Sequence, residues 1–383
     1  MSRFTTFISF LLLSIASSDA FAQREDMPLK VFGYFQNSLQ QWTAFQYQPA
    51  QNSFGLQQLN LFFQKDFNQN WTAFVNFEAL NTFSSSRHWG ALNLEEAWVK
   101  YSPNMKFNLK LGLQIPIFNN LNTIKNRTPV LPYIIRPLVY ETSFGEFIPL
   151  EEFVPARAFV QAYGFLPAGE AKLDYAAYVG NSPNSNDDPK NGQTGVDTTT
   201  AFLFGGRVGF RYRELKLGFS ATHEKSNGFA ESAPLLGRPV ADLQELPLTR
   251  RGGDLSFNLA NFSLESEFIN VDVNAGIPEV NLALDFFYIT VGYRFTNELY
   301  GYGSHWNTDV HVTVLIPRDE RMQDEDIIVS TAGLAYDLGD RIRLKGQFAR
   351  VRDNNKVRFI SQSVLENQQD SFNVWAMAVS VFF

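Results

Sequence analysis

The sequence predicts an all-β fold: a transmembrane antiparallel up-and-down β-barrel of about sixteen strands, with short periplasmic turns and long external loops. Three observations lead to it. Apolar and polar residues alternate in segment after segment, the connections between segments alternate in length, and the chain ends in an amphipathic stretch whose last residue is Phe383. A secreted soluble β-sandwich or propeller also shows alternation, so it is the competing fold.

The alternation has a period of two residues, which gives a strand one apolar and one polar face. Between Trp71 and Ala79, for example, every second residue is apolar, and Glu78 lies on the polar face. Many such segments have about the nine to eleven residues that a tilted strand needs to cross a membrane. The expected strands are roughly 29–39, 54–65, 71–81, 90–101, 106–116, 155–166, 171–180, 200–212, 214–224, 252–260, 262–272, 281–295, 299–316, 326–337, 341–352 and 370–383.

The connections between these segments point to a membrane barrel in particular. Such barrels join their strands by tight periplasmic turns at one end and by longer external loops at the other. Aromatic residues such as Trp71, Tyr101 and Tyr212 also stand near segment ends, where an interfacial girdle would lie. The short connections are 66–70, 102–105, 167–170, 213, 261, 296–298 and 338–340, and the long ones lie around 40–53, 82–89, 117–154, 181–199, 225–251, 273–280, 317–325 and 353–369.

The first 22 residues have the pattern of a cleaved secretory signal peptide. Arg3 is the positive start, 7–15 is an apolar run, and Ala20-Phe21-Ala22 offers the small residues of a cleavage site. The run is too short to span a bilayer, and no later run approaches a membrane-spanning helix. We therefore expect residues 1–22 to be removed and residues 23–383 to form a single barrel in the bacterial outer membrane.

Composition excludes several classes of function. The 383 residues include no Cys, which removes Cys-ligated zinc, iron–sulfur clusters and thiol nucleophiles. The four His are far apart and give little for a metal site. A net charge of -7 offers no basic surface for nucleic acid. We expect no cofactor, no metal and no nucleic-acid partner.

The connection 117–154 is by far the longest, and a connection of this length inside a compact fold usually has a function. It mixes charged residues with aromatic and aliphatic ones such as Phe118, Tyr133 and Ile134, which is too apolar for a purely solvated loop. We expect it to fold inward and narrow the barrel; the alternative is a cap over the rim or a subunit contact. The residues expected at the constriction are Lys125, Arg127, Arg136, Glu141, Glu146 and Glu151.

A ring of this size encloses more space than side chains can fill, which leaves an aqueous lumen for passive diffusion of small hydrophilic solutes. More basic than acidic residues fall on the expected inward faces, so we expect a mild preference for anions. A register slip or mutual pairing of these charges would change that reading. The residues expected to line the pore are Lys110, Arg157, Lys172, Arg207, Arg211, Lys216, Arg341, Arg343, Lys345 and Glu78.

The segment Glu96-Ala97-Trp98-Val99-Lys100-Tyr101, followed by Gly112, Pro116 and a long loop, resembles the outer-membrane porin superfamily. Within it, the stretch looks like the phosphate- and pyrophosphate-selective (porin O and P) group. The turn 336–340 is similar to porin hairpins near the C-terminus. The resemblance implies a sixteen-stranded, usually homotrimeric channel in outer-membrane lipid, with an inward-folded third external loop. The dense Arg and Lys ladders of phosphate-selective members have no counterpart in 117–154.

Two other functions compete with a passive channel. A plugged barrel could act as a surface receptor or adhesin, and the Asn- and Asp-rich loop 181–189 could hold calcium or could simply be a polar loop. An outer-membrane hydrolase needs a nucleophile, a base and an orienting partner. His88 follows a run of serines and His223 follows Thr222, but neither lies in a motif of that kind.

Overall fold

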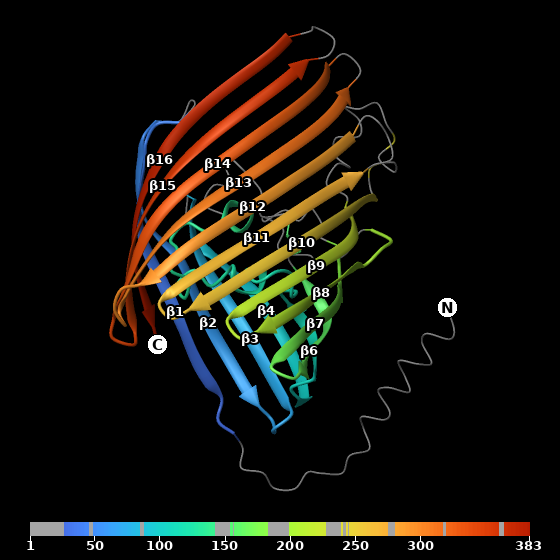
Figure 1. Ribbon diagram of the computed structural model, residues 1–383, viewed down its shortest axis with the longest axis vertical. Coiled ribbons are helices and arrows are strands. Elements are labelled where there is room, and N and C mark those ends of the chain that lie inside the picture. Colours follow the sequence, from blue (N-terminus) through green and yellow to red (C-terminus); the bar gives the residue numbers. More distant parts are fainter. Residues whose placement is uncertain are drawn as a thin grey trace.

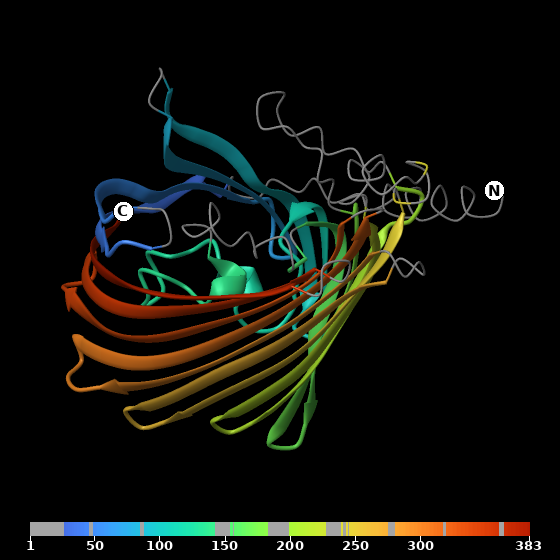
Figure 2. The same ribbon diagram turned by 90° about the horizontal axis from the view of Figure 1, so that it is seen from above.

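The computed structural model describes residues 27–45, 49–84, 88–141, 154–155, 157–182, 199–226, 239, 243, 245–274, 280–316, 319–359 and 364–383. The expected signal peptide, residues 1–22, lies outside the described residues. Figures 1 and 2 show one tilted, closed wall of strands with the described part of the longest connection inside it.

The described residues form sixteen antiparallel strands in one closed ring, as the sequence predicts. Each strand pairs with its neighbours in the chain, and the ring closes between the first and last strands, from Tyr34 opposite Phe382 to Trp42 opposite Val374. The strands and short 3-10 helices are β1 (Lys30–Trp42), β2 (Gln51–Asp66), β3 (Trp71–Ser84), β4 (His88–Asn104), β5 (Phe107–Gln114), η1 (Asn122–Ile124), η2 (Leu138–Tyr140), β6 (Ala158–Ala168), β7 (Ala171–Gly180), β8 (Leu203–Tyr212), β9 (Leu215–Ser226), β10 (Leu246–Leu259), β11 (Phe262–Asn274), β12 (Val280–Arg294), β13 (Leu299–Ile316), β14 (Asp319–Leu338), β15 (Ile342–Phe359) and β16 (Val364–Phe382).

Two of the expected long connections, 317–325 and 353–369, are wrong in extent. The β13–β14 ladder continues to the pair Ile316 and Asp319, and the β15–β16 ladder continues to Phe359 and Val364. The acidic stretch 319–326 is therefore strand and not loop. These extensions carry polar residues on both faces, so they lack the apolar alternation that marks a strand in sequence.

The outward face of the ring is apolar and the inward face is largely polar, which is the reverse of a soluble β-barrel. On β9, Phe219 is 74% exposed on the outside, while its neighbours Gly218 and Ser220 are buried on the inside. Large apolar side chains exposed on the outside include Phe204, Val208, Phe210, Val291, Leu334, Leu344, Trp375, Met377 and Val379. Polar side chains buried on the inside include Asn60, Asn76, Glu96, Gln161, Asp174, Thr222, Thr290, Thr331, Gln347 and Ser380.

The conformation of Gly112 marks the point where the chain turns from wall to lumen. Its φ is +118°, and a Cβ atom there would lie 2.3 Å from the carbonyl oxygen of Ala97. The pairing of β5 with β6 shifts register between Leu111 and Gln114, where β5 ends. Pro116, which has no N–H for a ladder, stands two residues after this end. β5 is therefore a short strand, and the described connection that follows it lies inside the barrel (Figure 2).

An outward face that lies in lipid should reject charge according to depth. We expect Phe219→Arg, in the middle of the apolar stretch of β9, to reduce the free energy of unfolding in lipid vesicles by about 2–4 kcal/mol. His223→Arg, on the same face but past the apolar stretch, should cost about 0–1 kcal/mol. Urea titration in vesicles measures both. Equal costs for the two substitutions would contradict a lipid-facing surface.

Candidate functional site in the barrel lumen

Residues 117–141, which are nearly all of the described part of the longest connection, lie inside the ring and contain η1 and η2. We call this segment the lumen loop. It has no strand ladder, so its backbone groups need other partners. Side chains on the inward faces of the strands supply many of them, and they do so from several sides of the barrel.

Glu267 on β11 holds one side of the lumen loop. Its Oε1 accepts hydrogen bonds from the N–H groups of Asn120, at 2.9 Å, and Leu121, at 2.7 Å. Its Oε2 accepts the hydroxyl of Tyr140 at 2.6 Å. Burial raises the pKa of the Tyr140 hydroxyl well above its ordinary value, so it stays protonated and able to donate. One carboxylate thus joins both ends of the described loop to the wall.

Two side chains on β15 hold the loop from another side. The Oε1 atom of Gln347 accepts from the N–H groups of Ile134 and Ile135 at 2.7 and 2.8 Å, and its Nε2 donates to the Ile135 carbonyl at 3.0 Å. The Nζ atom of Lys345 donates to the Thr128 carbonyl at 2.7 Å. Gln347 therefore pairs with the loop much as a neighbouring strand would.

The loop also reaches β2, which lies nearly opposite β9 in the ring. The Oε1 atom of Gln58 on β2 accepts from the Thr128 N–H at 3.0 Å. On β9, the hydroxyl of Ser220 accepts from the Asn119 N–H at 2.9 Å. The lumen loop therefore crosses the barrel and does not lie along one wall.

Apolar packing seals the loop against the wall made by β10–β16. A single cluster joins loop residues with inward-facing residues of these strands, and its largest members are completely buried. It includes Phe118, Leu121, Tyr133, Ile134, Ile135, Leu138 and Tyr140 of the loop and Ile269, Leu284, Phe286, Tyr288, Trp306, Val329, Val351 and Phe372 of the wall. On this side the interior is a packed core, so any water-filled passage must run elsewhere in the lumen.

Arg207 and Arg211, both expected to line the pore, lie on β8 and each pairs with a carboxylate. Arg207 binds Asp254 through Nε at 2.9 Å and Nη2 at 2.6 Å, and both side chains are buried. Arg211 pairs with Asp174 on β7. A similar ion pair, which the sequence does not predict, joins Arg250 to Glu224 at 2.5 Å, with both side chains fully buried. Much of the inward positive charge is neutralised within the wall.

Three of the lysines expected in the lumen contact uncharged groups or solvent. The Nζ atom of Lys110 lies 4.1 Å from the centre of the Trp98 ring, a cation–π contact. Lys216 donates to the side-chain carbonyl of Asn120 in the loop. Lys172, near the short-turn end of β7, is exposed. No described residue forms a direct ion pair with any of these three lysines.

The remaining expected pore residues lie near the ends of strands or under the loop. Arg343 pairs with Asp337 at 2.6 Å and donates to the Val130 carbonyl of the loop at 2.7 Å. Arg341 lies in the turn before β15 and is exposed, so it stands at the mouth and not in the wall. Arg157 precedes β6 and is half-buried.

Glu78 is buried on the inner face of β3, where its Oε1 accepts the side-chain amide of Gln58. It therefore lies in the wall behind the loop contact that Gln58 makes with Thr128. Its carboxylate does not face open lumen. The structure thus places this expected pore residue among the groups that support the loop.

The charged residues of the lumen loop pair mostly at close range. Arg136 lies 3.5 Å from Glu141, whose carboxylate also accepts the Arg136 N–H at 2.7 Å, and both side chains are buried. Arg127 lies 3.5 Å from Glu96 on β4. Lys125 is buried. Two further residues expected at the constriction, Glu146 and Glu151, lie outside the described residues.

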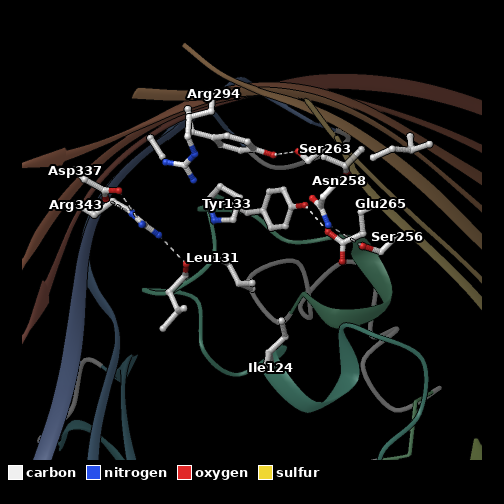
Figure 3. A pocket seen from close by; sticks show the side chains of 16 residues that line it. Ile124, Leu131, Tyr133, Ser256, Asn258, Ser263, Glu265, Arg294, Asp337 and Arg343 are labelled. Atoms are coloured by element: carbon white, nitrogen blue, oxygen red, sulfur yellow. Dashed lines mark hydrogen bonds and ion pairs between the residues drawn. The ribbon is translucent and has the colours of Figure 1, made fainter. Parts of the chain in front are cut away.

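A cavity of about 450 Å³ opens between the lumen loop and the short-turn end of β10–β15 (Figure 3). Its loop side carries Leu131, Pro132 and Tyr133, and its wall side carries hydroxyl, amide and charged groups. Burial raises the pKa of the Tyr133 hydroxyl well above its ordinary value, so it donates to Glu265 at 3.2 Å.

No group of three or more His, Asp or Glu side chains in the described ranges could hold a metal ion. No helix in that part of the chain is long and apolar enough to cross a membrane.

Lys216, Arg343 and Lys345, which the sequence predicts in the lumen, contact the loop, but several of its other anchors are residues that the sequence does not single out. Gln58, Gln347 and Tyr140 belong to no recognisable motif in the sequence. The only hint for Gln58 and Gln347 is that each occupies an inward-facing position of its strand. The partners of Glu267 on the loop, Asn120, Leu121 and Tyr140, likewise follow no sequence spacing.

Comparison with known proteins identifies the fold. No protein-family model matches the chain, and no curated protein sequence matches it. Several solved structures do match its fold. An anion-selective porin from Comamonas acidovorans superposes with a TM-score of 0.59 at 12% identity over 93% of this chain and 99% of that one. The outer membrane channel DcaP of Acinetobacter baumannii has a TM-score of 0.55 at 10% identity over 93% and 97%.

The trimer form of OmpT, an outer membrane protein of Vibrio cholerae, has a TM-score of 0.54 at 10% identity over 93% of this chain and 99% of that one. At these identities the likeness establishes the porin-type barrel fold. It does not establish the phosphate-selective group that the sequence resembles.

Gln347 offers the sharpest test of how the loop is held. We expect Gln347→Ala to leave the N–H groups of Ile134 and Ile135 without their acceptor, at a cost of about 1–3 kcal/mol per group. Amide hydrogen exchange at 134 and 135 should accelerate by at least about tenfold while exchange in the strands is unchanged. Gln64→Ala, on β2 away from the loop, is the control. Unchanged exchange at 134 and 135 would contradict this anchoring.

Proposed function

We propose that the chain is an outer-membrane channel for passive diffusion of small hydrophilic solutes, with anions preferred. The observation that carries the proposal is the arrangement of polarity around a closed ring. An apolar outer face suits lipid, a polar inner face suits water, and the ring is too wide for side chains alone to fill. The lumen loop narrows this space from within.

The anion preference rests on which member of each ion pair reaches solvent. The Arg211 side chain is 49% exposed while its partner Asp174 is 12% exposed. The Arg127 side chain is 37% exposed while Glu96 is 5% exposed. Lys172 adds an exposed charge that has no direct ion pair within the described ranges. In these two pairs the carboxylate lies beneath its cation, whereas in the pair Arg343–Asp337 the two side chains are similarly exposed, at 24% and 31%. The accessible charge near Arg127, Lys172 and Arg211 is therefore more positive than the overall composition suggests.

We further propose that residues 1–22 are a cleaved signal peptide and that the channel assembles as a homotrimer. The order of charge, apolar run and small residues supports the first. The resemblance to porins and the trimer form of the Vibrio cholerae relative support the second. Phosphate-like anions are substrates by resemblance only, because the described loop carries no dense cluster of Lys and Arg.

A plugged barrel that acts as a receptor is the second candidate, because the loop touches much of the ring. Besides its anchors on β2, β9, β11 and β15, its Ile117 N–H donates to Gln161 on β6 at 2.9 Å. Its Tyr133 ring packs against Tyr302 on β13, with ring centres 5.0 Å apart. A loop attached in this way could close the passage completely.

The reversal potential of the full-length mature protein in a planar bilayer under a salt gradient separates these functions. We expect a steady current with an anion-favouring reversal potential. A cation-favouring current would keep the channel and reject the electrostatic argument. Silence from folded, inserted protein would reject the channel and favour the plugged barrel.

The exposed cations should set the selectivity. We expect Arg211→Gln and Lys172→Gln each to shift the reversal potential toward cations, since the first leaves Asp174 unpaired and the second removes an accessible charge. Arg251→Gln is the matched control, because Arg251 is exposed on the outward face of β10. A shift of similar size in the control would show that the lumen charges are not responsible.

A further inference from the structure

The cavity between the lumen loop and the short-turn end of the wall has charges of opposite sign at its two sides. In Figure 3, Arg294 and Arg343 lie on one side of the Tyr133 ring, and Glu265 lies on the other. The lumen loop supplies one wall through Ile124, Leu131 and Pro132. The cavity therefore combines an apolar wall with two charged sides in a volume of about 450 Å³.

The carboxylate side of the cavity has no direct ion-pair partner in the described part of the chain. Glu265 on β11 accepts the hydroxyl of Tyr133 at 3.2 Å, and among the described residues no Lys, Arg or His lies within ion-pair distance of it. Ser256 lines the cavity next to it. This arrangement differs from Glu267 two residues on, whose carboxylate is fully occupied by the loop. Glu265 thus keeps acceptor capacity toward the cavity.

The guanidinium side is also incomplete. Arg294 donates to the Asn297 carbonyl at 3.0 Å and lies 5.8 Å from the centre of the Tyr300 ring, but within the described ranges it has no carboxylate partner. Arg343, by contrast, is matched by Asp337 at 2.6 and 3.1 Å. The free positive charge at this side is therefore that of Arg294.

Neutral hydrogen-bonding groups fill the wall between the two charges. The hydroxyls of Ser263 and Tyr300 lie 2.9 Å apart, and Thr290 and Asn258 also line the space. Arg294 is exposed and Glu265 is half-buried, so a ligand with a single charge would engage only one of the two sides. A ligand with an amine at one end and an acid at the other satisfies both.

We propose that this cavity binds a small zwitterionic solute, an amino acid or a dipeptide, with its ammonium group against Glu265 and its carboxylate against Arg294. The proposal deepens the proposed function and rests on it to the extent that the solute must reach the lumen. The cavity would then be a retention site beside the passage, which raises the local concentration of such solutes above that of singly charged ones.

Calorimetric titration of the folded, detergent-solubilised mature protein tests the proposal with three ligands of the same size class. They are alanyl-alanine, its N-acetyl derivative, which lacks the ammonium group, and its C-terminal amide, which lacks the carboxylate. We expect the zwitterion to bind on the order of tenfold more tightly than either capped form. Equal binding of all three, or no binding of alanyl-alanine at millimolar concentration, would overturn the proposal.

Two substitutions assign the ends of the ligand. Glu265→Gln should remove the preference over the N-acetyl derivative and keep the preference over the amide. Arg294→Gln should do the opposite. Glu170→Gln and Arg213→Gln are the controls, because they change charges of the same kind in turns away from the cavity. The assigned orientation would be contradicted if either variant lost both preferences. It would also be contradicted if both variants kept both preferences.

The binding readout is independent of conduction. Preferential binding by a protein that passes no current would uphold the cavity and reject the channel. A current without preference among the three ligands would uphold the channel and reject the cavity. Because the wild-type comparison needs no variant, misfolding of a substituted protein does not remove the test.

Discussion

Closure of the ring between β1 and β16 is the constraint on which the rest of the structure depends. A sheet with free edges would expose unpaired N–H and C=O groups, which lipid cannot satisfy. Once the sheet closes, every residue of a strand faces either out or in, and the two faces meet different surroundings. Phe219 and Ser220, adjacent on β9, show the result: one is exposed on an apolar exterior and the other is buried in a polar interior.

A ring of sixteen strands is too wide for side chains to fill, so its interior needs a further element. The lumen loop is that element, and having no ladder of its own it depends on the inner wall for hydrogen bonds. This explains the buried polar side chains of the strands. Glu267 and Gln347 accept backbone N–H groups that would otherwise be buried without partners. The polar lining is therefore partly a binding surface for the protein's own chain, and only the remainder is available to water and solutes.

The strands could be predicted from sequence because apolar and polar residues alternate in the part of each strand that lies within the apolar outer band of the barrel. Where hairpins extend past that level, as at 319–326, both faces are polar and the signal disappears although the ladder continues. The inward parity of Arg207 could be read from sequence, but its pairing with Asp254 could not, since the two residues lie on β8 and β10 and meet only when the register of both ladders is known. Loop anchors such as Gln347 carry no local pattern, because their partners are more than two hundred residues away.

The effect of the charges in a lumen on a passing ion depends on their exposure and pairing, and not only on their number. A carboxylate buried beneath an exposed guanidinium stabilises that guanidinium but presents little field to a passing ion, as Asp174 does under Arg211. Glu265 lines a cavity and, within the described ranges, has no cation beside it, so its carboxylate can act directly on whatever enters. The proposed anion preference therefore rests on the charges along β7 and β8, and the proposed zwitterion site on those beside β11 and β12. The lumen loop makes this division possible, because it buries some charges against one wall and leaves others open to the lumen.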